Sequence, residues 1–159
     1  MSLDDWLIAL HLLAAFALVG AILGFWAMLV AAWRTDRPGD VRAIFRLGPY
    51  LNAAVAIGAV GTLVLGIWLA VSLDAYEVWD GWVIAAIVLW IVVAAAGERA
   101  GAEYARAQQR AEELLQAGSD GPSQEVRSLV RTRRGLALQA VATVAAVLIL
   151  ADMIWKPGA

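Results

Sequence analysis

The sequence of 159 residues contains no cysteine and a single histidine, His11. Without thiols the chain can form no disulfide, thiolate metal site or thiol nucleophile. Charge is also scarce: 16 % of the residues are charged, whereas an ordinary soluble domain has about 25 %. No glycine-rich phosphate loop, zinc-protease pattern, nucleophile elbow or DNA-reading motif occurs. These absences argue against a soluble enzyme and against nucleic-acid binding.

Apolar residues dominate instead. They make up 62 % of the chain, and they gather in four runs at about 6–33, 49–73, 81–97 and 135–155. A helix of about 20 apolar residues crosses the roughly 30 Å hydrocarbon core of a bilayer, and for segments of this length a helix satisfies every backbone amide. The sequence therefore predicts an all-α membrane protein, a four-transmembrane-helix bundle that forms a single transmembrane domain over residues 1–159.

The charges between the runs predict the orientation. Every arginine falls on one side of the four runs, and the other side carries mainly acids. The arginines are Arg34, Arg37, Arg42, Arg46, Arg99, Arg106, Arg110, Arg127, Arg131, Arg133 and Arg134, and the acids opposite them are Asp4, Asp5, Asp74, Glu77, Asp80 and Asp152. Under the positive-inside rule the arginine side lies in the cytoplasm, so we expect a multi-pass protein of the bacterial inner membrane with both termini outside. An outer aromatic belt is expected at Trp6, Trp79, Trp82 and Trp155.

The segment between the third and fourth runs predicts a cytoplasmic helical hairpin at about 98–134. Residues 98–117 keep a helix-forming composition rich in Ala, Glu, Gln and Arg, so the third helix is expected to continue well beyond the membrane. The breakers at 118–122 stop it. Ser123 is a candidate N-cap for a helix that returns through Arg134 into the fourth run.

Small residues at helical spacing indicate how the spans associate, because membrane helices pack through close contact and polar groups rather than the hydrophobic effect. Gly20 and Gly24 make a GxxxG pair in the first run. The second run has a ridge at Ala54, Gly58, Thr62 and Gly66. Two uses stay open: packing within the chain, or a homodimer through Gly20 and Gly24.

Polar residues inside the runs are few, and two of them predict a site. His11 lies roughly 7–8 Å below the interface marked by Trp6, at 1.5 Å per residue, and Asp152 lies at a comparable depth in the fourth run. A carboxylate beside an imidazole orients it and favours its protonation. We therefore predict an outward-opening cofactor-binding site of His11 and Asp152, with haem as the possible cofactor. A proton relay and a small-ligand contact are other uses of such a site. The structural alternatives are a buried histidine satisfied by a neighbouring helix or one that reaches interfacial water, and an interfacial ion pair between Asp152 and Lys156.

No metal site and no catalytic residue are predicted, because a lone histidine without a second ligand at metal-binding spacing is weak evidence for a metal. Gln139 and Thr143 share one face of the fourth run. We expect them to hydrogen-bond across to Asn52 of the second run, as interhelical contacts.

The arginines that precede the fourth run are candidates for lipid binding. Arg131, Arg133 and Arg134 lie where they could hold anionic lipid head groups, at roughly 1 kcal/mol per basic residue. Membrane topology alone would also place them there.

Several short segments resemble bacterial four-helix membrane families. They are Leu10-His11-Leu12-Leu13 with Gly20 and Gly24, Gly61 to Trp68, Gly81-Trp82, and Asp152 to Pro157. Together they resemble a family of predicted bacterial integral membrane proteins of unknown function. More distantly, they are similar to the membrane protoporphyrinogen oxidase family and to the membrane domain of copper-resistance D proteins. The oxidase likeness implies that His11 corresponds to a first-helix histidine associated with haem.

The sequence favours a small, non-enzymatic membrane protein, an accessory or scaffold subunit whose cytoplasmic hairpin meets a protein partner. A haem- or metal-binding redox protein that uses His11 is the alternative. A small channel or transporter component is the second alternative; it predicts a continuous polar file along one helix face, where only scattered polar residues are found.

Overall fold

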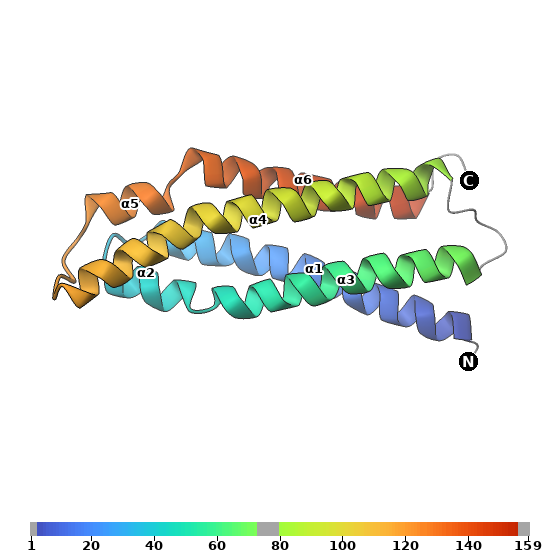
Figure 1. The fold of residues 1–159 in the computed structure, drawn as a ribbon, viewed down its shortest axis with the longest axis horizontal. Coiled ribbons are helices and arrows are strands. Elements are labelled where there is room, and N and C mark those ends of the chain that lie inside the picture. The colour runs from blue at the N-terminus through green and yellow to red at the C-terminus, as the bar shows by residue number, and fades with distance from the viewer. Residues whose placement is uncertain (1–2, 73–79, 156–159) are drawn as a thin grey trace.

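The computed structural model describes residues 3–72 and 80–155, and these residues form an all-helical structure (Figure 1). The helices are α1 (Leu3–Ala32), α2 (Pro38–Phe45), α3 (Gly48–Ser72), α4 (Gly81–Gln116), α5 (Gln124–Val130) and α6 (Arg133–Trp155). Four helical stretches are long and apolar enough to cross a membrane: Leu3–Ala32, Pro38–Val71, Gly81–Gln116 and Gln124–Trp155. The predicted fold class is confirmed. Asp74, Glu77, Trp79 and Lys156, which entered the sequence argument, lie outside the described residues.

α4 continues far beyond its apolar run, as the sequence predicts. At 1.5 Å per residue its residues 98–116 project about 28 Å past the run that ends at Gly97. Gly118 follows with a φ of 76°, a left-handed conformation that glycine adopts without steric cost and that commonly ends a helix. Ser123 then caps α5, since its hydroxyl accepts a hydrogen bond from the backbone N–H of Val126. These local signals were sufficient to predict the hairpin.

The returning helix differs from the prediction in one respect. It was expected to run unbroken through Arg134, but α5 ends at Val130 and α6 begins at Arg133. The indole N–H of Trp33 donates to the Val130 carbonyl at 3.1 Å, and the Arg131 guanidinium donates to the Trp33 carbonyl. The break thus coincides with a tertiary contact to the end of α1, which sequence periodicity does not reveal.

α2 was not predicted at all. It begins with Pro38, whose missing N–H costs nothing in the first turn of a helix. Its buried residues, Pro38, Val41 and Phe45, recur at intervals of three and four, and so they form one face. The segment between the first two spans, for which the sequence analysis predicted no element, therefore contains a short helix that packs its apolar face inward.

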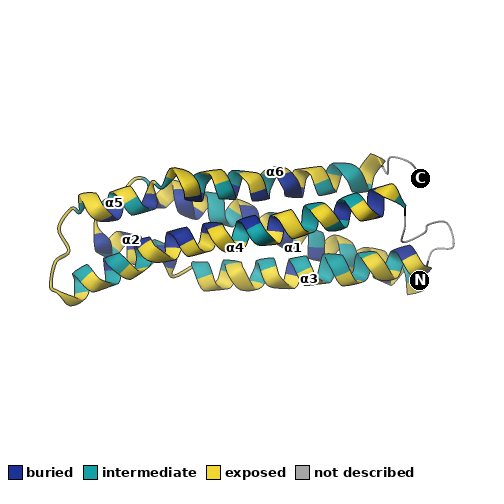
Figure 2. Cartoon of the chain, turned by 45° about the horizontal axis from the view of Figure 1, so that its top comes forward, coloured by how far each residue is buried: buried dark blue, intermediate teal, exposed yellow. Residues whose placement is uncertain are grey.

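The long helices are arranged as two antiparallel pairs (Figure 1). α1 packs along α3 in the first pair, and α4 packs along α6 in the second. α2 and α5 both pack on the part of α4 beyond Gly97; these three segments are called the head. α1 begins and α6 ends at the opposite end, called the terminal end. Exposed residues cover the outward sides of the pairs (Figure 2), and large apolar ones such as Phe16, Ile57 and Val144 lie there, as expected of lipid-facing surface.

The first pair is held by close approach of its backbones. A Cβ atom added at Gly58 would lie 2.6 Å from the backbone N of Leu18 and 2.9 Å from the carbonyl oxygen of Ala14. One added at Gly61 would lie 2.9 Å from the Cβ of Ala14. The glycines of the second span thus face α1, which agrees with packing within the chain.

The GxxxG pair of α1 is divided between two environments. A Cβ at Gly24 would lie 2.7 Å from a methyl carbon of Leu51 on α3, whereas a Cβ at Gly20 would meet no atom within 4 Å. Gly24 therefore serves the first pair. A homodimer through both glycines stays a prediction.

Tryptophan hydrogen bonds connect the two pairs. The indole N–H of Trp26 on α1 donates to the Thr143 hydroxyl on α6 at 2.9 Å, and that of Trp90 on α4 donates to the Ala59 carbonyl on α3 at 3.0 Å. Thr143 in turn donates to the Gln139 carbonyl. The expected contact with Asn52 is wrong, because Thr143 is engaged by Trp26 and Asn52 is exposed.

The head has the most completely buried side chains. Val41, Ala107, Ala111 and Val126 are 0 % exposed. They belong to a cluster that also includes Leu29 near the end of α1. Two contacts close its tip: the Asp120 carboxylate accepts from the backbone N–H of Gly39 at 2.8 Å, and the backbone N–H of Ser123 donates to the Asp36 carbonyl at 2.9 Å.

Asp120→Ala is expected to loosen α2 by removing this carboxylate from its first turn. A carboxylate that accepts from a first-turn amide is typically worth about 0.5–2 kcal/mol. We expect faster hydrogen exchange of the α2 amides, measured by mass spectrometry, with α6 unchanged. The control is Ser119→Ala, next in the chain and exposed, which should leave α2 exchange as it is. Equal α2 exchange in both variants would contradict this assignment.

Candidate functional site

His11 faces α3 within the first pair. Its Cε1 atom lies 3.1 Å, and its Nδ1 atom 3.5 Å, from the position that a Cβ of Gly66 would take. The Nδ1 atom is buried, and no hydrogen-bond partner for it lies among the described residues. Gly66 thus provides the space that the ring occupies.

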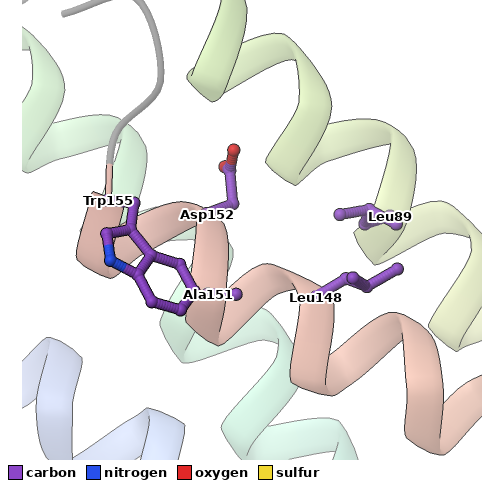
Figure 3. A pocket seen from close by; sticks show the side chains of 5 residues that line it. All are labelled: Leu89, Leu148, Ala151, Asp152 and Trp155. Atoms are coloured by element: carbon purple, nitrogen blue, oxygen red, sulfur yellow. The ribbon is translucent and has the colours of Figure 1, made fainter.

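Asp152 lies on the second pair, in the last turn of α6. It lines a shallow, largely apolar hollow of about 280 Å³ together with Leu89, Leu148, Ala151 and Trp155 (Figure 3). Its Oδ2 atom is buried and has no hydrogen-bond partner within 3–72 and 80–155. The predicted ion pair with Lys156 falls outside the described residues.

The two residues of the predicted cofactor site therefore have different neighbours. His11 packs on α3, whereas Asp152 is beside α4, and no hydrogen bond or ion pair joins them in the described part of the chain. No group of three or more His, Asp or Glu side chains that could hold a metal ion occurs among the described residues. A haem site at His11 and Asp152 stays a prediction.

The three arginines proposed for lipid binding differ in their contacts. Arg131 donates to the Trp33 carbonyl, and the Arg134 Nε atom lies 3.4 Å from a carboxylate oxygen of Glu103. Arg133 is exposed. All three are exposed where the head meets α6, and lipid binding by them stays a prediction.

Residues 5–157 match the profile of a family described as predicted integral membrane protein (DUF2269). The chain belongs to this family. The function of the DUF2269 family is unknown, so membership adds no activity. No curated protein and no solved structure matches the chain. The resemblance to a family of predicted integral membrane proteins is thereby confirmed, whereas the more distant likenesses to the oxidase and copper-resistance families stay predictions.

One polar cluster of this DUF2269 chain was missed at the sequence level. Glu103 is buried on α4, where its carboxylate accepts from Arg106 at 3.0 Å and approaches Arg134. The neighbouring Tyr104 is also buried and stacks on Phe45, with ring centroids 6.3 Å apart. It lies beyond the apolar run of α4, and burial, with a smaller effect of the Glu103 charge, raises its pKa to about 12.

A signal for this cluster exists in the sequence. Ala100, Glu103, Tyr104, Ala107 and Ala111 are all buried, and their spacing of three and four residues is that of one helix face. The small side chains of Ala100, Ala107 and Ala111 on this face could have indicated a packed stripe, with Glu103 inside it. We interpret the cluster as structural, since its carboxylate is satisfied by arginines from α4 and α6.

Proposed function

We propose that the protein is a non-enzymatic membrane scaffold whose four spans anchor the head at the cytoplasmic face, where it meets a protein partner. The observation that carries the proposal is the packing of the head. Its core side chains at Val41, Ala107, Ala111 and Val126 are fully buried. Membrane anchoring alone requires no such core, whereas a binding surface that must keep its shape does.

The charges of the head favour a protein partner over a nucleic acid. Arg110 pairs with Glu113 at 2.8 Å and with Glu125 at 3.0 Å, and Arg106 pairs with Glu103. Hydrogen bonds to Glu113 and Glu125 raise the pKa of Arg110 further. Nucleic-acid affinity comes largely from basic side chains that neutralise phosphates, and here several of those side chains already have acidic partners.

The proposed orientation puts the head in the cytoplasm of a bacterium and both termini outside. Its support is the positive-inside rule, because the head and the segments beside it carry all the arginines. Since the chain has no cysteine, single-cysteine variants report accessibility without background. In intact spheroplasts a membrane-impermeant maleimide should label Leu3→Cys, whereas Ser119→Cys should react only in inverted vesicles. The reverse pattern would overturn the orientation.

The scaffold proposal is tested by site-specific photo-crosslinking in native membranes. A photoreactive residue at Gln109, exposed on the head, should give one discrete protein adduct, and the same residue at lipid-facing Val144 should not. The charge reversal Arg127→Glu, which leaves the Glu103 cluster intact, should remove the Gln109 adduct. Adducts that are absent from Gln109, or the same from both positions, would contradict a partner at the head.

The absorption spectrum tests the redox alternative. His11 packs against the α3 backbone at Gly66, so we expect the purified protein and its His11→Ala variant to show the same ultraviolet absorption and no Soret band. A Soret band that disappears in His11→Ala would favour the haem protein instead. The protein should be purified from cells supplied with a haem precursor, so that a shortage of haem cannot explain the absence of a Soret band.

A further inference from the structure

The hollow around Asp152 combines a carboxylate with apolar walls. Asp152 contributes the carboxylate, and Leu89, Leu148 and Ala151 contribute methyl and methylene surface (Figure 3). The Oδ2 atom is buried, without a hydrogen-bond partner among the described residues. A carboxylate in such surroundings is costly unless it gains a donor or a cation, and so the chemistry of the hollow favours a ligand with a positive or donating group.

The position of the hollow narrows the class of ligand. Asp152 is three residues from Trp155, so it lies about 4.5 Å from the end of α6 along the helix axis, at 1.5 Å per residue. Trp155 is itself exposed and borders the hollow. At this depth a bilayer changes from head groups to acyl chains, and a ligand there meets polar surroundings at one end and apolar ones at the other.

Charge complementarity then selects the head of the ligand. An ammonium group can pair with the Asp152 carboxylate through a charge-assisted hydrogen bond. An anionic head would be repelled by the carboxylate. A bare divalent ion is not favoured, because Ca²⁺ and Mg²⁺ require several oxygen ligands, and Asp152 is the only carboxylate that lines the described hollow.

We propose that this hollow binds the ammonium group of an alkyl-chain amphiphile, with Asp152 as its counter-ion and Leu89, Leu148 and Ala151 in contact with its chain. Two sources supply this chemistry: a membrane lipid with an amine head group, and a lipophilic amine that enters from outside. The inference is independent of the scaffold function proposed for the head, since the hollow is at the terminal end.

The test uses the full-length protein reconstituted in phosphatidylcholine vesicles with a nitroxide-labelled alkylammonium probe. Electron paramagnetic resonance measures the motionally restricted fraction of the probe. We expect a restricted fraction for the wild type, and a rise of about tenfold in the dissociation constant for Asp152→Asn, which corresponds to 1.4 kcal/mol. Glu98→Gln, the matched loss of an exposed carboxylate at the other end of the α4 span, should bind as the wild type does.

Two further variants keep the test decisive. Asp152→Glu should restore binding, and Leu148→Trp should weaken it by filling the hollow while the carboxylate stays. Equal binding by wild type and Asp152→Asn overturns the proposal. Since Lys156 could itself supply an ammonium four residues along the chain, a large gain of affinity in Lys156→Met would also overturn it.

Competition distinguishes the two sources. If phosphatidylethanolamine in the vesicles displaces the probe and phosphatidylglycerol does not, the occupant is a lipid amine. If only added dodecylammonium displaces it, while the matched neutral dodecanol does not, the occupant is a lipophilic amine. If phosphatidylglycerol and dodecanol displace the probe as effectively as the amines do, the hollow does not distinguish ligands by charge, and the proposal is overturned.

Discussion

Gly58→Ala is expected to lower the unfolding temperature of the detergent-solubilised protein by several degrees. The new Cβ would lie 2.6 Å from the backbone N of Leu18 and 2.9 Å from its Cα. Backbone atoms cannot rotate away as a side chain can, so α1 and α3 must separate along their contact. Overpacking of this kind typically costs about 1–3 kcal/mol, occasionally more, and for a chain of this size each kcal/mol shifts the midpoint by roughly 2–4 °C.

The control for Gly58→Ala is the same substitution at Gly20. A Cβ there meets no atom within 4 Å, and alanine is the better helix former, so the unfolding temperature should stay the same or rise slightly. Samples are heated to a series of temperatures and passed over a size-exclusion column, and the tryptophan fluorescence of the intact-protein peak is recorded. The temperature at which half of this peak is lost gives the unfolding temperature of each variant. If both glycines tolerate alanine equally, the close backbone contact between α1 and α3 is wrong.

Leu29→Ala is expected to destabilise the protein by about 2–5 kcal/mol, the range for large-to-small substitutions at fully packed positions. Leu29 is 1 % exposed and belongs to the cluster that includes Val41 and Val126 of the head. Alanine would leave a cavity where α1 meets the head. The free energy of unfolding, measured by denaturant titration in detergent, should therefore fall.

Leu23→Ala supplies a matched control on the same helix. Leu23 is 62 % exposed on a lipid-facing side of α1, and lipid is as apolar as the side chain that is removed. Its loss leaves no internal cavity, so the free energy of unfolding should change little. A loss for Leu23→Ala as large as that for Leu29→Ala would show that α1 is packed differently.

The parts of the fold that could be predicted from the sequence are those with a local signal. Hydropathy marked the four spans, and helix-forming residues followed by the breaker at Gly118 marked the extension of α4. The hydroxyl of Ser123 marked the start of α5. α2 was not predicted because its apolar face consists of only Pro38, Val41 and Phe45. Three apolar residues are too few to give the segment a high mean hydropathy.

The candidate site was harder to predict because the depth of a residue in the membrane does not specify which neighbouring helix its side chain faces. His11 and Asp152 were placed at comparable depths from residue counts alone. Helix pairing decides which neighbour each side chain meets, and the counts contain no information about it. The ring of His11 lies on Gly66 of α3, while Asp152 shares a hollow with Leu89 of α4. The pairing of α1 with α3 rests on glycine contacts that are visible only once both helices are placed.

The arrangement in successive pairs has a consequence for biosynthesis. α1 and α3 are neighbours in the chain apart from α2, so both sides of the Gly58 contact are translated before α4. The first hairpin can enter the bilayer and pair as a unit, and α4 with α6 can follow as a second one. α2 can pack on the end of α1 at once, but it meets α4, with which it makes most of its contacts, only after α4 is translated. The head can therefore close only after the first hairpin has been made.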